Sequence, residues 1–332
     1  MRSRLDDGLD GDRPLLVVLA DDRDEEDHDV LFPAIRARGV SVVRIHPYDL
    51  VVHLAPTGAA FTVDGRPIRP DLVLGWVLGE LLTPGMVQLD VLARAGIPVL
   101  NDAMTLFRAE NKLLDSSRLA AHGLLRHPVL AGYDRTALTP GFTEDGVTVV
   151  KPLNGYGGQG IARLETAADY DAFRREEASP DSGFCAMPWV ENPGRDIRVY
   201  TIDHHPVFAM YRYAPGDDWV TNVTAGGSIA MCPLTPELID LAARASRAAG
   251  TVIGGVDIGE DLETGGHVVY EVNSCPTCEP PVLEEAADFL AAATADLDAA
   301  RSTWRPRRVR TELDEDPALF HASKRHLLRA RE

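Results

Sequence analysis

Lysine and glycine residues are combined at 148–160 in a way that suits phosphate binding. This stretch reads TVVKPLNGYGGQG, so a β-branched run leads to Lys151 and then to a loop with Gly155, Gly157, Gly158 and Gly160. Glycine lets the backbone approach a ligand closely, and backbone N–H groups beside one ammonium group commonly hold a polyphosphate. The alternative is a glycine-rich hairpin that carries an exposed lysine, because short motifs also match by chance.

The glycine spacing does not fit either of two other phosphate-binding templates. Gly155, Gly157 and Gly160 match the dinucleotide fingerprint, but that fingerprint opens a helix, whereas residues 161–165 alternate like a short strand. The Walker A template requires Gly-Lys followed by Ser or Thr, and no such triplet follows this loop. The sequence therefore predicts a hairpin lid over phosphates.

Hard oxygen ligands lie on two later apolar stretches. Asp257 stands in GVDI, and Glu271 and Asn273 stand in YEVN. Alternate residues of a strand face the same way, so Glu271 and Asn273 should point together, with Asp257 on a strand alongside. Two carboxylates and an amide oxygen suit Mg²⁺, which also binds phosphates. An acid in an apolar strand is costly unless paired or liganded, so a metal site is favoured over ordinary surface residues.

Further cations precede and follow the glycine loop. Lys112 lies in a predicted helix, and with Lys151 it would bracket the phosphates of a nucleotide. Arg198, in Asp196-Ile197-Arg198, and Arg212 lie on a predicted hairpin. A guanidinium can bind phosphate or carboxylate through two parallel hydrogen bonds. Surface arginines on an edge hairpin are an equally good interpretation of the spacing alone.

The first part of the chain is expected to form an α/β domain that helps to position these residues. In the first part of the chain, β-rich and helical patterns alternate, which predicts a small parallel sheet with helices on both faces. The strands are expected at residues 14–20, 40–45, 71–76 and 97–100, the helices at 30–38 and 84–95, and a hairpin at 61–68.

The rest of the chain predicts two mixed lobes. The expected helices are at residues 103–122, 167–177, 236–250 and 283–300, and the expected strands are at 129–131, 147–150, 184–190, 197–202, 206–213, 254–258 and 267–272. We expect an N-terminal α/β domain at 14–101, a central lid subdomain at 102–186, a C-terminal subdomain at 187–300 and a charged surface tail at 301–332.

The composition limits the kind of partner. The chain has 332 residues, 45% of them hydrophobic and 25% charged, and a net charge of −18. This negative charge argues against binding to nucleic acid or to a membrane surface. No apolar run is long enough to span a membrane and the first residues lack a signal core, so a cytoplasmic protein is expected. The acidic runs at 21–22, 24–27 and 314–316 are expected to be solvated surface.

Taken in order, these features resemble the ATP-grasp superfamily, most closely the RimK-like carboxylate–amine ligases, over residues 70–290. The resemblance implies an ATP-grasp fold of three lobes with a C-terminal antiparallel sheet, and ATP and Mg²⁺ as cosubstrate and cofactor. The residues it implies for ATP binding are Lys112, Lys151, Gly155, Gly157, Gly158, Gly160, Met187, Trp189, Val190, Glu191 and Asp196. The residues it implies for catalysis are Arg198, Arg212 and Asn222, and for Mg²⁺ they are Asp257, Glu271 and Asn273.

Two departures from the family pattern stand close to the expected site. The family often has Asn-x-x-Arg-Gly-Gly, but here Ala225 replaces the arginine after Asn222, so recognition must differ at that point. After Asn273 the family commonly continues to Pro-Gly, whereas this chain reads SCPTCEPP. Cys275 and Cys278 form a C-x-x-C without a second pair, which leaves packing or pocket lining as the favoured interpretation over zinc binding or a redox switch.

The resemblance implies an ATP-dependent ligase that joins a carboxylate to an amine through an acyl phosphate and releases ADP and phosphate. The expected partners are small-molecule carboxylate and amine substrates, with a peptide or carrier protein as an open alternative, and a homo-oligomer is also left open. A catalytically silent nucleotide-binding module is a second hypothesis, against which the acidic set argues. A bicarbonate-using grasp enzyme is a third.

Overall fold

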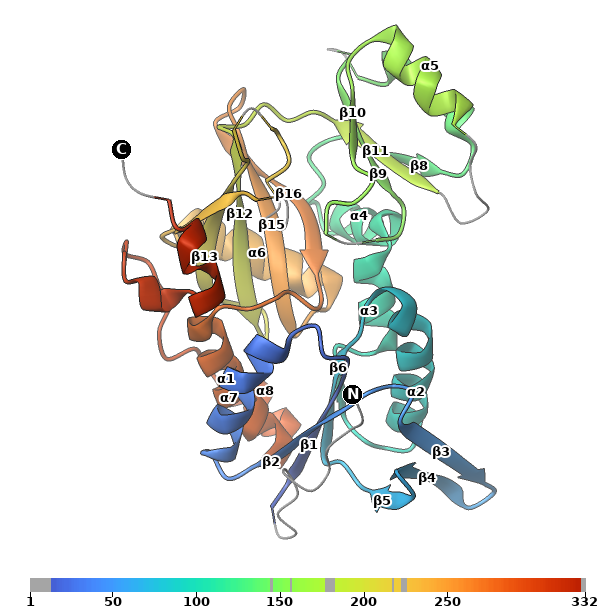
Figure 1. The fold of residues 1–332 in the computed structure, drawn as a ribbon, viewed down its shortest axis with the longest axis vertical. Coiled ribbons are helices and arrows are strands. Elements are labelled where there is room, and N and C mark those ends of the chain that lie inside the picture. Colours follow the sequence, from blue (N-terminus) through green and yellow to red (C-terminus); the bar gives the residue numbers. More distant parts are fainter. Residues whose placement is uncertain are drawn as a thin grey trace.

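The computed structural model describes residues 13–143, 146–155, 157–176, 183–216, 218–221 and 226–329. The chain forms three lobes: an N-terminal lobe at the bottom of Figure 1, a central lobe at the upper right and a C-terminal lobe at the upper left. Each lobe contains one principal sheet. Strand β11 and helix α8 run across the boundaries expected at 186 and 300.

The N-terminal lobe is a parallel sheet with helices on both faces, as the alternating pattern predicts. Its strands, in spatial order, are β2 (Ser41–Ile45), β1 (Leu15–Ala20), β6 (Leu72–Trp76) and β7 (Val99–Leu100). Helix α1 (Glu25–Arg36) lies on one side and α2 (Leu82–Arg94) on the other (Figure 1). Every residue of β1 is buried, which explains the continuous apolar run in its sequence.

A small antiparallel sheet projects from this lobe. It contains β3 (Leu50–Ala55), β4 (Gly58–Val63) and β5 (Arg66–Ile68). The predicted turn at Asp64 and Gly65 is confirmed, since both residues have positive φ, but the sequence missed β3. The side chains of Val51 and Leu54 are exposed on β3.

One expected long helix is two helices. Residues 103–122 form α3 (Ala103–Glu110) and α4 (Lys112–Ala121), which are separated at Asn111. The backbone of Asn111 is extended, with φ −100° and ψ 109°, and its side chain accepts a hydrogen bond from Leu114 N, capping α4. Helical periodicity continues across the break, so the pattern alone did not reveal it.

The central lobe is a four-stranded antiparallel sheet. Its strands, in spatial order, are β10 (Ala162–Leu164), β9 (Thr148–Pro152), β11 (Phe184–Pro188) and β8 (Leu130–Gly132). Strands β9 and β10 pair antiparallel on either side of the glycine loop, which confirms the predicted hairpin. Helix α5 (Ala167–Arg175) begins at a capping box formed by Thr166 and Asp169.

The C-terminal lobe is a five-stranded antiparallel sheet. Its strands, in spatial order, are β14 (Ser228–Met231), β13 (His205–Tyr213), β12 (Arg195–Ile202), β15 (Ile253–Asp261) and β16 (Gly266–Asn273). Helix α6 (Pro236–Ala249) covers one face with the side chains that the helical pattern placed inward. Helix α7 (Pro280–Ala295) packs against β12 and β13 and also against α1, so it joins this lobe to the N-terminal one.

Three sequence expectations about the outer segments are wrong. The last helix ends at Ala295 and a separate helix α8 (Leu297–Thr303) follows. Beyond Trp304 the chain is not simply a surface tail, because Leu319, Phe320 and His321 are buried. The acidic run at 24–27 begins α1, and Asp27 within it is buried, with its carboxylate accepting a hydrogen bond from Cys278 N at 2.7 Å.

In the part of the chain that the structure describes, no helix has both the length and the apolar character needed to cross a membrane.

Candidate active site

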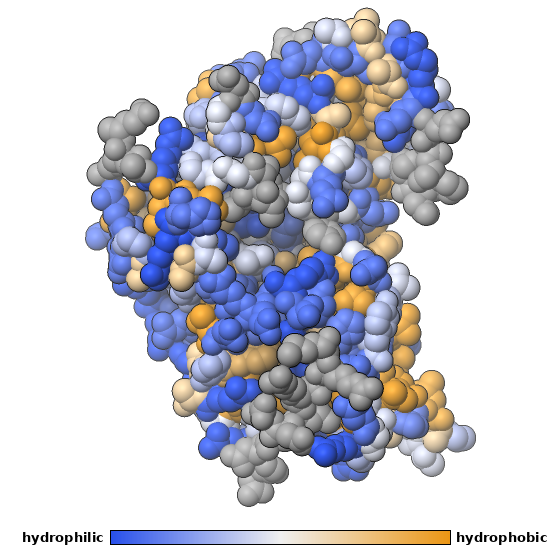
Figure 2. All heavy atoms as spheres, viewed as in Figure 1, coloured by the Kyte–Doolittle hydropathy of each residue, from blue (hydrophilic) through white to orange (hydrophobic). Residues whose placement is uncertain are grey.

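A cavity of about 460 Å³ lies between the three lobes. Figure 2 shows a hollow there, with hydrophilic residues around it. The residues predicted from sequence that line the cavity are Lys112, Lys151, Gly155, Gly157, Gly158, Met187, Trp189, Val190, Asp196, Arg198, Arg212, Asp257, Glu271 and Asn273. Residues from six separate stretches of sequence therefore meet in one place, as the ordered pattern implied.

Two of the predicted nucleotide residues do not line the cavity. Gly160 has φ +70°, and a Cβ there would lie 2.9 Å from Pro152 Cγ, so its role is to close the hairpin. Glu191 accepts a hydrogen bond from Trp189 Nε1 at 2.9 Å, so it orients a lining residue. A third predicted residue, Asn222, lies outside the described residues.

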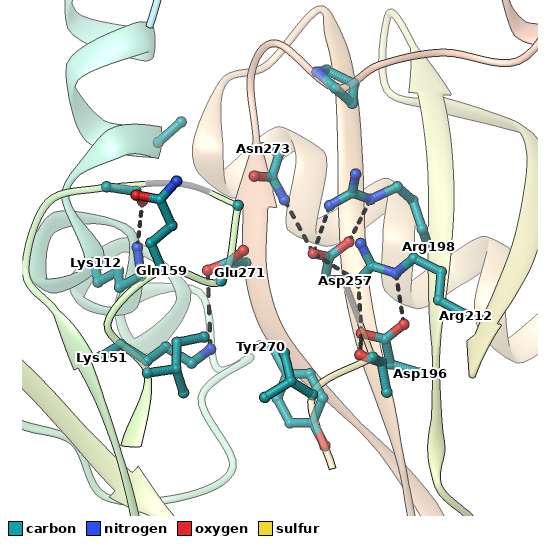
Figure 3. Close-up of a pocket in the computed structure, with 18 of the residues that line it drawn as sticks. Lys112, Lys151, Gln159, Asp196, Arg198, Arg212, Asp257, Tyr270, Glu271 and Asn273 are labelled. Carbon is teal, nitrogen blue, oxygen red and sulfur yellow. Dashed lines mark hydrogen bonds and ion pairs between the residues drawn. The ribbon is translucent and has the colours of Figure 1, made fainter. Parts of the chain in front are cut away.

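The two lysines stand on the central-lobe side of the cavity. Lys112 is the first residue of α4, and its Nζ donates a hydrogen bond to Gly155 O at 2.7 Å. Lys151 on β9 has its Nζ 4.0 Å from Glu271 Oε2 on β16 and 5.7 Å from the ring centre of Tyr270. Lys112 is therefore in contact with the glycine loop, and Lys151 faces the acids of the C-terminal sheet (Figure 3).

The opposite wall is a row of charged residues on the C-terminal sheet. Arg198 on β12 lies opposite Asp257 on β15, and Asp257 lies opposite Glu271 on β16. Arg198 donates to Asp257 through Nε and Nη2, both at 2.8 Å. Burial alone would raise the pKa of Asp257, but Arg198 and Arg212 hold that pKa well below its ordinary range.

Arg212 is held mainly by a different carboxylate. It lies opposite Asp196 on the neighbouring strand and donates to it through Nε at 2.7 Å and Nη2 at 2.6 Å. Asp196 also accepts a hydrogen bond from Thr221 Oγ1 at 2.7 Å. The carboxylate of Asp196, which the resemblance assigned to ATP binding, is thus bonded to an arginine and a loop hydroxyl.

The side-chain oxygens of Asp257, Glu271 and Asn273 could supply part of the ligand shell of a hard divalent cation. The structure has no cluster of three or more His, Cys, Asp or Glu side chains within its described ranges that could hold a metal. Asp257 and Glu271 lie side by side, and Asn273 adds an amide whose Nδ2 donates to Asp257 Oδ2 at 3.2 Å. Two carboxylates and one amide oxygen would need phosphate and water oxygens to complete a Mg²⁺ shell, which is the usual manner of Mg²⁺ binding.

At the far end of the cavity, sequence reasoning anticipated the C-x-x-C segment but missed the residues of the N-terminal lobe. This end is lined by Asp21, Arg23, Asp24, Trp76, Leu78 and Glu110, together with residues 274–277. Burial raises the pKa of Glu110, and burial followed by the nearby Asp27 raises that of Asp24. One available signal was position: Asp21 follows the carboxyl end of β1, and ligands of parallel α/β sheets bind outside such ends.

The C-x-x-C segment forms part of this end. Cys275 lines the cavity, whereas Cys278 is fully enclosed, and all four cysteines are free thiols. Burial raises the pKa of both Cys275 and Cys278, which keeps them protonated and unreactive. Pocket lining and packing, the favoured interpretation of the sequence, agree with these environments.

Comparisons with known proteins agree with this geometry. A family model for the RimK-like ATP-grasp domain matches residues 148–286. The α-aminoadipate–LysW ligase LysX of Saccharolobus solfataricus is 30% identical over 190 residues, with 55% of this chain and 68% of LysX covered. This chain belongs to the RimK-like ATP-grasp family.

Other members of the family extend the comparison. The tetrahydromethanopterin:α-L-glutamate ligase of Methanosarcina acetivorans is 31% identical over 212 residues. The match covers 56% of this chain and 65% of that RimK-like relative, slightly less than two thirds of its length. The solved structure of the ATP-grasp ligase PsnB with a minimal precursor has a TM-score of 0.66 at 22% identity, and covers 85% of this chain and 99% of PsnB. The predicted ATP-grasp fold is confirmed by this likeness.

Proposed function

We propose that this RimK-like protein is an ATP-dependent ligase that joins a carboxylate to an amine through an acyl phosphate and releases ADP and phosphate. The observation that carries the proposal is the arrangement across one cavity: Lys112 and Lys151 on one side, and Asp257, Glu271 and Asn273 on the other. That arrangement suits a triphosphate, whose transfer chemistry depends mainly on positioning and charge neutralisation.

The cavity residues would have different roles, according to where each one lies. The ammonium groups of Lys112 and Lys151 would neutralise the phosphates, beside glycine N–H groups of the hairpin. Trp189 and Val190 follow β11, at the end of the cavity where the nucleotide base would lie. Arg212, fixed by Asp196, would hold the transferred phosphoryl group and then the acyl phosphate. The substrate carboxylate is the nucleophile, so the chain needs no serine or cysteine for that step.

Asp257, Glu271 and Asn273 are the residues that would hold Mg²⁺. When bound, such a cation neutralises phosphate charge and helps to align the phosphoryl group. The glycine hairpin would cover the reacting groups and exclude water, which would otherwise hydrolyse an acyl phosphate. This protection explains why a lid, and not an open groove, suits the reaction.

The substrates belong to the same proposal. The relatives above are named as ligases of α-L-glutamate and of α-aminoadipate with LysW, which favours an amino-acid substrate. A second candidate is a peptide or a carrier protein. The solved structures of PsnB with a minimal precursor and of the macrocyclase MdnC with its precursor peptide favour it, and the MdnC structure covers 84% of this chain at a TM-score of 0.63.

Product analysis tests the proposal. The protein is incubated with Mg²⁺, ATP and a panel of carboxylates and amines, and hydroxylamine is added to trap an acyl phosphate as a hydroxamate. We expect ADP and phosphate to form in a substrate-dependent way, with a hydroxamate. AMP in place of ADP would indicate adenylation and contradict the mechanism, and no nucleotide turnover with any substrate would favour a silent binding module.

Glu271→Gln is the matched variant for that assay. It keeps the size of the side chain but removes the charge that faces Lys151 and would bind the cation. We expect a folded protein whose ADP release falls by at least about a hundredfold, in line with losses of catalytic electrostatic groups. Retention of turnover in a folded Glu271→Gln protein would refute its assignment to the metal site.

A further inference from the structure

The two arginines of the C-terminal wall are anchored unequally. Among the contacts of the described residues, Arg212 has two carboxylate partners, Asp196 and Asp257, the second with its Oδ2 3.0 Å from Arg212 Nη2. Arg198 is bonded to Asp257 alone. Loss of Asp257 would therefore leave Arg212 in place on Asp196, but it would leave Arg198 without a carboxylate.

The carboxylate of Asp257 is contacted by four donors, three of them at the same oxygen atom. Its Oδ1 accepts from Arg198 Nε, and its Oδ2 is approached by Arg198 Nη2, Arg212 Nη2 and Asn273 Nδ2 (Figure 3). A carboxylate offers about four lone-pair sites. A cation that binds through Oδ2 must displace one of its three donors, and an incoming positive charge at either oxygen repels the adjacent guanidinium groups.

Arg198 points toward the far end of the cavity. A methyl group on Gly255 would lie 3.0 Å from Pro276 Cβ and 3.5 Å from Arg198 Nε, so both side chains flank this glycine. The Arg198 side chain is 17% exposed and that of Arg212 only 6%. Of the two, Arg198 is thus the more exposed, and it lies beside the wall formed by residues 274–277.

We propose that Asp257 serves two partners in turn: Arg198 holds it in this structure, and Arg198 leaves it when a divalent cation binds, which provides an anion-binding guanidinium beside residues 274–277. The proposal rests on the proposed function, because it assumes the nucleotide–metal site. It implies that the cation–nucleotide pair binds before the substrate carboxylate, since the carboxylate site is formed by the release of Arg198.

Calorimetric titration of ADP, with excess Mg²⁺ and separately with a chelator, tests the exchange. Arg198→Met removes the competitor for Asp257 but leaves Asp257 bonded to Arg212. We expect Mg²⁺ to tighten ADP binding more in Arg198→Met than in the wild type, by about fivefold or more, a common size for coupling between sites. Equal or weaker Mg²⁺ dependence in the variant would overturn the proposal.

Arg195→Met is the matched control. Arg195 lies on the same strand and pairs with Glu260 through Nε at 2.6 Å and Nη2 at 2.9 Å, but Glu260 is not a candidate cation ligand. The Mg²⁺ dependence of ADP binding should match that of the wild type. If the wild type binds no Mg·ADP, the proposed function fails. If the wild type binds Mg·ADP and Arg198→Met shows no greater Mg²⁺ dependence, the exchange at Asp257 alone is contradicted.

A second readout follows the side chain directly. In ¹⁵N spectra of the arginine Nε–H groups, assigned with Arg198→Lys and Arg212→Lys, the Arg198 hydrogen should exchange faster with solvent after Mg·ADP is added. The Arg212 hydrogen should remain protected by Asp196. Continued protection of both groups in the Mg·ADP complex would show that Arg198 does not leave Asp257.

Discussion

At the scale of single residues, side chains of opposite charge are paired within the cavity. Lys151 faces Glu271, and Asp257 is shared by Arg198 and Arg212. A triphosphate brings additional negative charge that the lysines and arginines must offset. Lys151 and the two arginines therefore each have an acidic partner within the fold and also line the cavity, so removal of one of these charges should affect binding more than folding.

Lys151→Ala should weaken ATP binding severely. A hydrogen bond to a charged group contributes about 1.5–3 kcal/mol, so we expect roughly a 10- to 100-fold rise in the dissociation constant, measured by calorimetry. Arg94→Met is a suitable control, because the Arg94 side chain is 77% exposed and pairs with Asp90 on the surface of α2. Unchanged ATP binding by Lys151→Ala would refute the role assigned to Lys151.

Asp115 gives a pH-dependent prediction. It lies one turn after Lys112, is fully buried and accepts a hydrogen bond from Val272 N at 3.1 Å. Burial raises its pKa from 3.8 to about 7. Between those two values the folded protein keeps a proton that the unfolded chain has lost, so the stability that Asp115 contributes falls as pH rises toward 7.

Asp115→Asn can keep the acceptor for Val272 N but cannot ionise. Relative to this variant, the wild type should lose a few kcal/mol of unfolding free energy between pH 4 and pH 8, since each pKa unit corresponds to about 1.4 kcal/mol. Urea denaturation at several pH values measures the difference. Parallel pH curves for the two proteins would show that Asp115 ionises normally in the fold.

The residues of the nucleotide end could be predicted from sequence because each belongs to a short local pattern. Lys151 precedes a glycine loop, and Glu271 and Asn273 alternate on one strand. Asp21, Arg23 and Glu110 carry no such pattern, and they line the cavity because the loop after β1 and the end of α3 meet residues 274–277 there. That convergence is set by the packing of α7 on α1, which no local pattern records.

At the scale of elements, the break between α3 and α4 joins the glycine hairpin to the rest of the protein. Lys112 N donates to Leu153 O at 2.9 Å, and Asn111 Nδ2 donates to Asn154 Oδ1 at 2.7 Å. Asn111 also caps α4 through its Oδ1, at 3.1 Å from Leu114 N. One side chain therefore starts the helix that carries Lys112 and also holds the lid.

Two variants of Asn111 separate these functions. Asn111→Ala loses both the cap and the contact with Asn154, and should lower the unfolding free energy by about 1 kcal/mol. Asn111→Asp keeps a capping oxygen but has no amide to donate to Asn154. Both variants should speed amide hydrogen exchange in residues 153–160, and only Asn111→Ala should be markedly less stable. Unaltered exchange in both would show that the lid is held elsewhere.

Helices and strands could be predicted where a periodic apolar pattern extends over many residues, as in α6. The positions where elements begin and end were harder to predict. The pattern of residues 103–122 stays helical across Asn111, and the break depends on contacts between Asn111 and the hairpin of the central lobe. Strand β3 was missed because four of its six residues are exposed and Leu50 alone is buried, and an exposed strand has no apolar alternation to detect.

At the scale of the whole molecule, the C-terminal segment connects lobes. Lys324 Nζ lies 2.6 Å from Glu279 Oε1, and His321 N donates to Glu279 Oε2 at 3.0 Å. Glu279 is completely buried and lies two residues after the segment that lines the far end of the cavity. Farther on, Arg329 N donates to Ile229 O on β14. The segment thus contacts α7, α1 and the edge of the C-terminal sheet.

Lys324→Met should be strongly destabilising, because it leaves the buried carboxylate of Glu279 without its cation. Removal of one partner of a buried pair costs about 3–5 kcal/mol. Combination with Glu279→Gln should recover part of that loss, because no charge then remains buried. Chemical denaturation of the two single variants and the double variant measures the coupling, and strictly additive losses would contradict it.

The central claim is that the substrate carboxylate attacks ATP within this cavity, and isotope transfer tests it most directly. A carboxylate substrate identified by ADP release is labelled with ¹⁸O and turned over with Mg·ATP and the amine. Because one carboxylate oxygen leaves with the phosphoryl group, we expect one ¹⁸O in the released phosphate and none in ADP. Phosphate without the label, or the label in AMP, would contradict an acyl-phosphate mechanism.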